Sequence, residues 1–589
     1  MINNRESGVF MPTKTINQIK LISFKLKELE QLKNHFDKSS AKKKMILIRW
    51  FETKKILNAK MLTTYHDTLS FIRAYPDNSL ILKAVDRELF NFGKRVDLYK
   101  KETRDKNAAK LLNSGISGST VEHPFSLGVI KLLLKYYPKK LSVDWENLLE
   151  SVPDEIFSTL PLLLAWHEND ALDNDDYTDV PGWLKIAGQK KSRSDIETLV
   201  KIFTSSAVPS NIQDYLFEKF EIPIEWNLND SNGSRSKKRL PFNKVFYQRE
   251  PIIRRTSDLR AEFTKPAKPL KLLSERRGKE LVQQVNEVLA VRYRELHPLT
   301  YANPKEVYLY EPGRGVQIYL FGSIPEIRLP LESNFGAMLV RNGLPIGYGV
   351  GATLLERVEI AINIFPAFRT GESSFIIEHF FKLFYNHFGS RVFLVNKFQM
   401  GDGDDEPIHS GAFWFYYKLG FRAVKQKIRR MAEKEHSKIK SHKNYRSSFQ
   451  TLKRLSKSDV FLHFEPDQMN DFHEISLMNL GYIVTRSIGK HYHGDRALAT
   501  NKSVAKLEKS LSLRGWQKWP EGEIHALKRM APLLSKIPGL SKWSLKDKKN
   551  LIEIIRAKGC TTERKYAILS TKHTKYINAL WRLSQVNTE

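Results

Sequence analysis

The chain contains one cysteine, Cys560, among 589 residues. A disulfide within the chain is therefore impossible, and a zinc site built from cysteine ligands is excluded. Apolar runs are also short, because none approaches the roughly 20 residues that a helix needs to cross a bilayer. The first residues, MINNRESGVFMPTK, lack the apolar core of a signal peptide. We therefore expect a soluble, cytoplasmic protein with no membrane span.

Acidic residues are scarce relative to basic ones. Lysine and arginine number 96 against 65 aspartates and glutamates, which gives a formal net charge of +31. Such an excess favours an anionic partner, although a generally cationic surface explains it equally well. Hydrophobic residues make up 41% of the chain, enough for packed cores and too many for a disordered protein. The length predicts about three or four domains.

Apolar periodicity divides the chain into regions. Spacings of three and four residues, as in LISFKLKELEQL and FSLGVIKLLLKYY, predict a largely helical N-terminal region over residues 1–227. The polar segments NLNDSNGSRSKKRLPF and TKPAKPLK predict a linker over residues 228–273. An amphipathic helix, SERRGKELVQQVNEVLAVRYREL, then opens a central domain over residues 274–424. Residues 425–589 again have helical patterns and many charged residues, which predicts a basic, mostly helical C-terminal region.

The central domain alternates strand and helix patterns. VYLYE and VQIYLFG are short, β-branched and aromatic, and two apolar runs flank Asn342-Gly343, a dipeptide typical of a tight hairpin turn. RVEIAINIFP, SSFIIEHFFKLFYNHF, RVFLV, AFWFYYKL and GFRAV then predict strand, helix, strand, helix and strand. The predicted fold class is α+β and multidomain, with a central mixed sheet flanked by helices.

One stretch in this domain resembles a known motif. HSGAFWFYYKLGF, from His409 to Phe421, is similar to the last-helix motif of the GNAT superfamily of acetyl-CoA-dependent N-acyltransferases. His409 stands where the family usually has asparagine. The predicted order of elements also resembles the GNAT fold, and the likeness covers about a quarter of the 589 residues. The matching positions are Ala412, Phe415, Tyr416, Lys418, Leu419, Gly420 and Phe421.

A second stretch, EIAINIFPAFRTGESSF, resembles the family's fourth strand and its pyrophosphate-binding turn, R-G-x-G-x-G/A. With Gly371 aligned on the central glycine, Arg369 falls one position late and Ser373 replaces the last small residue. Independently, a strand–turn–helix junction exposes unpaired N–H groups and a helix dipole that suit an anion, while an ordinary serine-capped helix start is the alternative. The resemblance implies a binding turn for acyl-CoA formed by Phe368, Arg369, Thr370, Gly371, Glu372, Ser373 and Ser374.

The resemblance also implies catalytic residues. Tyr416 takes the place of the family tyrosine that protonates the departing thiolate, with a core tyrosine as the alternative. An amine acceptor with a pKa of about 10.4 needs a base at neutral pH. Glu356 and Glu359 flank the start of a predicted strand and face opposite sides of it. Glu359, inside the strand pattern, is the candidate base, and a glutamate at the rim is the alternative.

Other motifs are weaker. The acidic loop from Asp402 to Glu406 would attract a cationic acceptor, although a solvated loop explains it as well, and EF-hand spacing is missing. The glycine-rich run from Gly347 to Gly351 lies within a strand pattern, which disfavours a dinucleotide-binding turn. His491 and His493 form an H-x-H pattern, which alone is poor evidence for a metal site, so no metal site is predicted.

These patterns lead to two functional hypotheses. The first is transfer of an acyl group from acetyl-CoA or a related acyl-CoA, used as co-substrate, to an amine acceptor by direct attack in a ternary complex. The central domain has no cysteine to carry an acyl intermediate. The second is a non-catalytic GNAT-like scaffold that binds nucleic acid or another polyanion. Residues 425–454, with eleven lysines or arginines and two acids, are its candidate surface, unless they form only a solvated helix.

Overall fold

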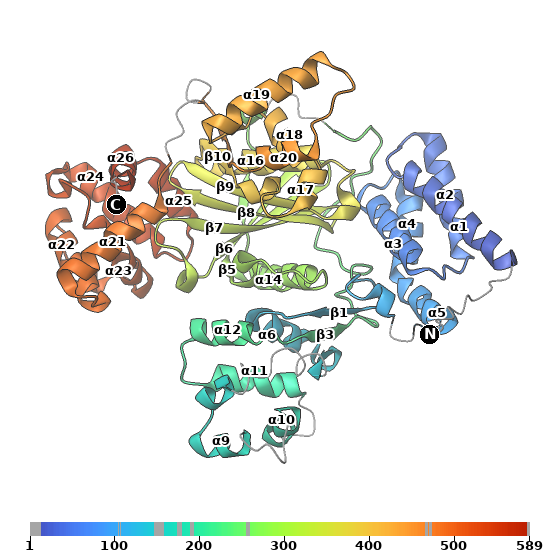
Figure 1. Cartoon of the computed structure of the whole chain (residues 1–589), viewed down its shortest axis with the longest axis horizontal. Coiled ribbons are helices and arrows are strands. Elements are labelled where there is room, and N and C mark those ends of the chain that lie inside the picture. The colour runs from blue at the N-terminus through green and yellow to red at the C-terminus, as the bar shows by residue number, and fades with distance from the viewer. Residues whose placement is uncertain are drawn as a thin grey trace, which may run out of the picture.

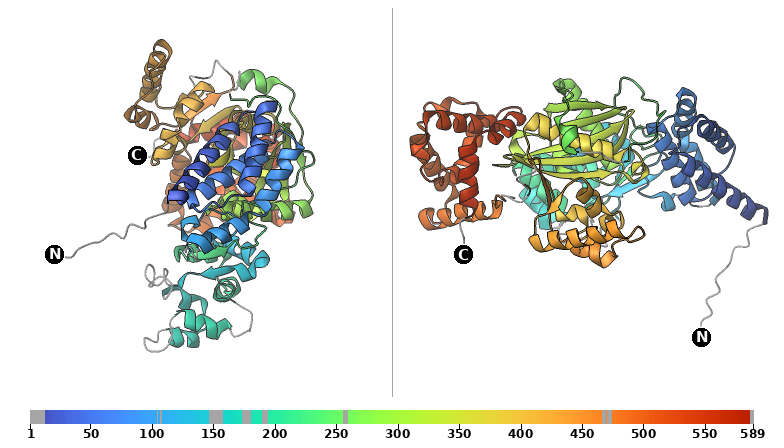
Figure 2. Two further views of the ribbon diagram at one scale, coloured as in Figure 1. Left: turned by 90° about the vertical axis from the view of Figure 1, so that its right-hand side faces the viewer. Right: turned by 90° about the horizontal axis from the view of Figure 1, so that it is seen from above.

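A computed structural model of the chain describes residues 13–103, 105, 108–145, 158–172, 180–188, 194–254, 259–465, 469 and 474–585. Nine of the described strands form one mixed sheet at the centre of the molecule. Figure 1 shows helices above and below this sheet and helical domains around it. Figure 2 shows the N-terminal and C-terminal helices at opposite ends of the sheet. The predicted mixture of helices with a central mixed sheet is confirmed.

The N-terminal region contains two separate cores. The first is formed by α1 (Thr13–Leu32), α2 (Lys38–Glu52), α3 (Ala59–Ala74), α4 (Ser79–Phe90) and α5 (Phe92–Thr103). The second contains β1 (Thr120–His123), α6 (Leu127–Tyr136), β2 (Leu141–Val143), α9 (Trp166–Leu172), α10 (Val180–Gly188), α11 (Asp195–Ser205), α12 (Ser210–Lys219) and β3 (Ile224–Asn227). Its strands form a small antiparallel sheet with β3 in the middle. The sequence analysis missed these strands because three or four residues carry too little alternation.

The segment predicted as a linker is packed against its neighbours. It contains α13 (Leu259–Thr264) and β4 (Leu270–Leu272). Ser234 and Ser236 are fully buried, and the Ser236 hydroxyl lies 3.1 Å from Nε2 of His66. Arg235 donates a 2.6 Å hydrogen bond to Asp67 of the N-terminal helices. The polar composition of this segment therefore reflects buried partners rather than free chain.

The elements of the central domain follow the predicted order. The two-residue turn at Asn342 and Gly343 is confirmed, with φ angles of 48° and 78°, and it joins β7 to β8. The elements are α14 (Glu275–Ala290), α15 (His297–Thr300), β5 (Ala302–Gly313), β6 (Val316–Ser323), β7 (Ser333–Arg341), β8 (Leu344–Leu354), β9 (Arg357–Ile364), α16 (Ser373–Phe388), β10 (Val392–Val395), α17 (Asp405–His409), α18 (Ala412–Lys418), β11 (Arg422–Ala423), α19 (Gln426–Ser441), α20 (Phe449–Leu455) and β12 (Val460–His463).

The strand order of the sheet is β11-β12-β10-β9-β8-β7-β6-β5-β4. Strands β9 and β10 are parallel and joined through α16, whereas the other neighbouring pairs are antiparallel. Strand β12 lies between β10 and β11 and is antiparallel to both. The sheet therefore extends beyond the boundary predicted at residue 424, because a short strand follows the basic helices α19 and α20.

The C-terminal region is mostly helical, as predicted, and packs around its own core, which includes Leu507, Leu527, Leu551 and Tyr576. Its helices are α21 (Leu477–Tyr492), α22 (Arg496–Leu511), α23 (Glu521–Leu534), α24 (Leu545–Lys558), α25 (Arg564–Thr571) and α26 (Thr574–Ser584). No described helix in the protein is both long enough and apolar enough to cross a membrane.

Candidate active site

The two parallel strands at the centre of the sheet separate partway along their length. Strand β9 pairs with β8 over its whole length, from Arg357 to Ile364. Its pairing with β10 covers three positions and ends where Glu359 faces Leu394. Strand β10 continues to pair with β12 as far as Val395. Beyond Glu359, the edge of β9 that faces β10 has no strand partner among the described residues, and its last carbonyl, that of Ile364, accepts a hydrogen bond from Arg369.

The turn that follows β9 contains the residues predicted to bind the cofactor. Phe368 is buried in the core, while Thr370 is exposed. Arg369 donates a 3.1 Å hydrogen bond to the Ile364 carbonyl and a 2.6 Å hydrogen bond to Glu406. The Arg369 side chain is therefore held by the strand end and by the acidic loop.

A tyrosine from the N-terminal helices covers the middle of this turn. The backbone N–H of Glu372 donates a 3.0 Å hydrogen bond to the hydroxyl of Tyr75, which follows α3. A Cβ atom at Gly371 would lie 2.3 Å from the same hydroxyl. Gly371 is therefore required for close packing against Tyr75, a constraint that the sequence motif does not reveal.

The Glu372 side chain is fully buried and anchors the turn to the sheet. Its carboxylate accepts hydrogen bonds of 2.5 Å from Arg314 and 2.6 Å from Arg341, and a 3.2 Å bond from the Ile253 N–H. Burial alone raises the pKa of Glu372, but the two guanidinium groups and the Ile253 N–H outweigh burial and lower it. The Glu372 carboxylate is therefore buried and ionised, and it is already paired with Arg314 and Arg341.

The serines that begin α16 are half-buried. The Ser373 hydroxyl donates to the Arg369 carbonyl at 3.3 Å, and the Ser374 hydroxyl donates to the Arg254 carbonyl at 3.1 Å. The first hydrogen bond back along the helix runs from the Ile376 N–H to the Glu372 carbonyl. The N–H groups of residues 373–375 precede that bond and, with the dipole of a 16-residue helix, offer an anion site.

Tyr416 lies on α18 with 5% of its surface exposed. Burial raises the pKa of its hydroxyl to about 12, so the phenol stays protonated at neutral pH. The described part of the chain supplies no hydrogen-bond partner for this hydroxyl. The buried tyrosines Tyr310 and Tyr576 also have hydroxyls without a partner among the described residues, so this feature alone does not separate a catalytic tyrosine from a core tyrosine.

A chain of aromatic rings connects Tyr416 to the point where β9 and β10 separate. The Tyr416 ring lies 5.5 Å from Phe421, which lies 5.6 Å from Phe381 of α16. Phe381 lies 5.5 Å from Phe393, the neighbour of Leu394 in β10. Tyr416 and the separating strands therefore belong to one packed cluster.

Glu359 is half-buried at the last position where β9 pairs with β10. It lies on the sheet face opposite to its buried neighbours Val358 and Ile360, and Glu356 lies exposed before the strand begins. No hydrogen bond joins Glu359 to Tyr416 among the described contacts, and the aromatic cluster of Tyr416 packs on the Val358 face of the sheet through Phe393.

Sequence reasoning missed a second carboxyl group, Glu332, which directly precedes β7. Burial raises the pKa of Glu332, the Arg357 guanidinium opposes this, and the charge of Glu359 raises the pKa further. A carboxyl group with a raised pKa next to a second carboxylate suits proton transfer. No local signal marks Glu332, since only the β7–β8–β9 pairing brings it near Glu359.

The acidic loop before α18 is largely neutralised by nearby basic side chains. Asp402 lies 2.6 Å from Lys397 and also binds Lys457, and Asp404 caps α17. His409 is exposed, with its ring 5.2 Å from Phe449. Two further ion pairs join Asp405 to Lys453 and Glu406 to Arg369. The loop consequently offers less attraction to a cationic acceptor than its sequence indicates.

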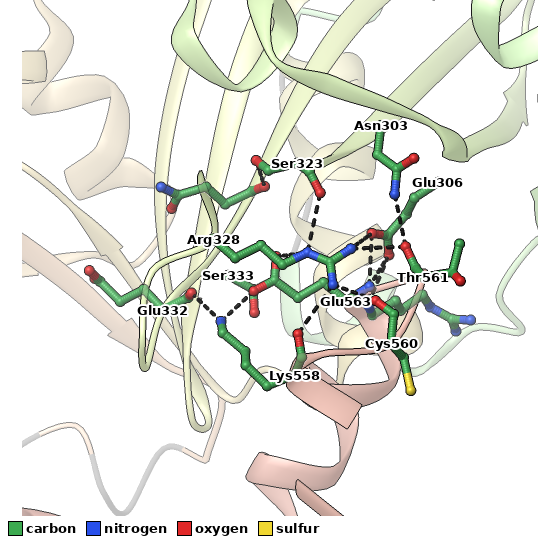
Figure 3. Close-up of polar contacts among 12 residues, drawn as sticks. Asn303, Glu306, Ser323, Arg328, Glu332, Ser333, Lys558, Cys560, Thr561 and Glu563 are labelled. Atoms are coloured by element: carbon green, nitrogen blue, oxygen red, sulfur yellow. Dashed lines mark hydrogen bonds and ion pairs between the residues drawn. The ribbon is translucent and has the colours of Figure 1, made fainter. Parts of the chain in front are cut away.

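A cleft of about 730 Å³ lies at the other end of the sheet, between the chain that follows β6 and helices α23 and α24. Figure 3 shows the junction beside it, where Arg328 donates to the carbonyls of Lys558 and Thr561 at 3.2 and 2.9 Å. The carboxylate of Glu306 accepts a 2.7 Å hydrogen bond from the Glu563 N–H. The cleft is remote from the turn, because the turn contacts Arg314 at the opposite end of β6.

Two groups of side chains in the described chain could hold a cation, and neither includes a predicted site residue. Glu262, Glu378 and His379 form one group, but Glu262 already pairs with Lys265 and Lys382, whose charges oppose a metal. Glu122, Asp144 and Glu225 form the other. Comparisons of the chain with protein-family models, with curated proteins and with solved structures found no match.

Proposed function

We propose that the protein is an acyl-CoA-dependent N-acyltransferase and that the acyl-pantetheine arm lies between β9 and β10. The open edge of β9 beyond Glu359 carries this proposal. Each amide of a pantetheine arm has one donor and one acceptor, so the arm can pair with a strand edge as another strand would. The parallel pair supports such a site because β10 leaves β9 while β9 continues to Ile364.

The cofactor phosphates would bind at the start of α16. The N–H groups of residues 373–375 and the helix dipole favour an anion there. Arg369 is 41% exposed at its side chain and pairs with Glu406, which is 60% exposed. Such a surface pair contributes little, so Arg369 can exchange Glu406 for a phosphate. The Glu372 N–H takes no part because Tyr75 already accepts its hydrogen bond.

The reaction is a direct transfer. The amine nitrogen attacks the thioester carbonyl carbon, a C–N bond forms, and the C–S bond breaks. The Tyr416 hydroxyl gives its proton to the departing sulfur and regains one from solvent. The proton lost by the amine passes to Glu359, directly or through a water.

Purified full-length protein with acetyl-CoA and a panel of primary amines tests the proposal, with release of free thiol as the readout. Saturable acetyl-CoA binding with amine-dependent thiol release supports an enzyme. Nucleic-acid binding without any acyl-CoA binding would instead support the non-catalytic scaffold.

A further inference from the structure

The C-terminal helices carry a large share of the positive charge. Residues 475–585 contain 22 lysines or arginines but only seven aspartates or glutamates. Three ion pairs within the described part of this region join Arg556 to Glu523, Lys558 to Glu563 and Lys575 to Asp547. Most of the cations therefore have no carboxylate partner among the described residues.

Helix α22 gathers part of this charge on one face. It packs into the domain through Ala499, Val504, Leu507 and Leu511, which are buried. Lys502, Lys506 and Lys509 are all exposed, and the described chain provides none of them with an acidic partner. At about 100° per residue, the three lysines fall within an arc of about 60° that lies opposite the buried Val504 and Leu511 and borders the buried Ala499. Figure 1 shows α22 at the outer side of the C-terminal domain.

Neighbouring helices add cations to the edge of this face. Burial lowers the pKa of Lys536, which follows α23, and the charge of Lys506 lowers it further. The Lys536 ammonium also donates to the Ser487 hydroxyl of α21, a helix that exposes Arg486 and Lys490. Like charges that lie this close repel one another, and a bound polyanion would relieve the repulsion.

The chemistry of the face distinguishes between polyanions. The α22 sequence, RALATNKSVAKLEKSL, has no aromatic residue to stack on the bases of a single strand. Leu498 is the one large apolar residue on its exposed side, whereas a membrane-surface helix needs a broad apolar face. Lys502 and Lys509 are about 10 Å apart along the helix, a length over which duplex DNA carries about six phosphate charges.

We propose that the exposed face of α22 binds the phosphate backbone of double-helical nucleic acid. This proposal does not depend on acyl transfer. It also differs from the hypothesis for residues 425–454, since α19 lies over the central sheet and apart from the C-terminal helices (Figure 1). Lys425, Lys427 and Arg430 are exposed at the start of α19, so they supply a matched control of equal charge.

The test uses the full-length protein and a labelled DNA duplex of about 20 base pairs, with fluorescence anisotropy measured as salt rises from about 50 to 200 mM. One variant carries Lys502→Gln, Lys506→Gln and Lys509→Gln. The control carries Lys425→Gln, Lys427→Gln and Arg430→Gln. At about 0.9 per phosphate contact, the first variant should reduce the slope of log affinity against log salt by about 3, while the control keeps the wild-type slope.

Several outcomes would overturn the proposal: no duplex binding at the lowest salt, an equal loss in both variants, or a larger loss in the α19 control. Tighter binding of a single strand of the same sequence, or of vesicles rich in phosphatidylserine, would overturn it too. Circular dichroism and thermal melting should be the same for both variants because all six side chains are exposed. The single change Lys506→Gln provides a second test, because it should reduce the slope of log affinity against log salt by about 1.

Discussion

Tyr75 accepts a 3.0 Å hydrogen bond from the backbone N–H of Glu372, which joins the N-terminal helices to the turn before α16. The guanidinium of Arg341 lies 4.1 Å from the centre of the Tyr75 ring and binds the Glu372 carboxylate. Gly371 allows this approach because it has no Cβ atom. The N-terminal domain therefore forms part of the framework of the candidate active site.

Replacing Tyr75 by phenylalanine should destabilise the protein by about 1–3 kcal/mol, because the buried Glu372 N–H loses its acceptor. Urea unfolding of the full-length protein measures the change. The control is Tyr482→Phe, which removes the same hydroxyl group from a tyrosine that is 50% exposed. Equal stability of the two variants would show that the Tyr75 contact has no energetic role.

Two adjacent changes in the turn should have different effects. Thr370→Glu adds a negative charge at an exposed position, so it should weaken acetyl-CoA binding at least tenfold while leaving the melting temperature unchanged. Gly371→Ala should lower the melting temperature, since its Cβ would lie 2.3 Å from the Tyr75 hydroxyl. Calorimetry and thermal melting on both variants test the pair. Unchanged affinity in Thr370→Glu would remove the turn from the cofactor site.

Tyr416→Phe should reduce kcat by about 10²- to 10⁴-fold if the hydroxyl protonates the thiolate. Acetyl-CoA affinity and unfolding free energy should both be retained, since no described residue bonds this hydroxyl. Initial rates of thiol release and urea unfolding on one preparation provide both readouts. Wild-type turnover in the variant would end the assignment of Tyr416 as the acid.

The junction between the sheet and the C-terminal helices should respond to pH. Burial raises the pKa of Glu306 from 4.5 to about 7, so the folded protein holds this proton more tightly than the unfolded chain does. The resulting stabilisation is complete below about pH 4.5 and is lost as pH rises through about 7. Between pH 5 and pH 8 the loss should be about 2.5 kcal/mol.

Glu306→Gln cannot titrate and should remove this part of the pH dependence, whatever its effect on stability at a single pH. The control Glu553→Gln changes an exposed glutamate on α24 and should keep the wild-type profile. Unfolding free energies at pH 5, 6, 7 and 8 make the comparison. Parallel pH profiles for wild type and Glu306→Gln would refute the assignment.

Local patterns in the sequence predict much of the central domain. The hairpin at Asn342 and Gly343 depends on two residues that tolerate positive φ angles, and the apolar spacing of α14 and α16 extends over 16 residues in each helix. The strand before the turn and the helix that carries Tyr416 are likewise recognisable from short segments. Each of these features is specified by neighbours in the sequence.

Long-range contacts account for what was missed. Strand β12 is only VFLH, and it becomes part of the sheet through pairing with β10 and β11. The sequence predicts Ser234 and Ser236 as linker residues, because their burial depends on contacts with His66 and Ser117, more than a hundred positions away. Glu332 and Tyr75 reach the candidate site only through tertiary packing, which residue spacing does not encode.

Calorimetric titration of the full-length protein with acetyl-CoA tests the central claim most directly, because acyl transfer between β9 and β10 requires that ligand to bind. We predict saturable binding at one site with a dissociation constant in the micromolar range, and weaker binding in Thr370→Glu. No detectable binding at about 1 mM, which corresponds to less than about 4 kcal/mol of binding free energy, would contradict the account.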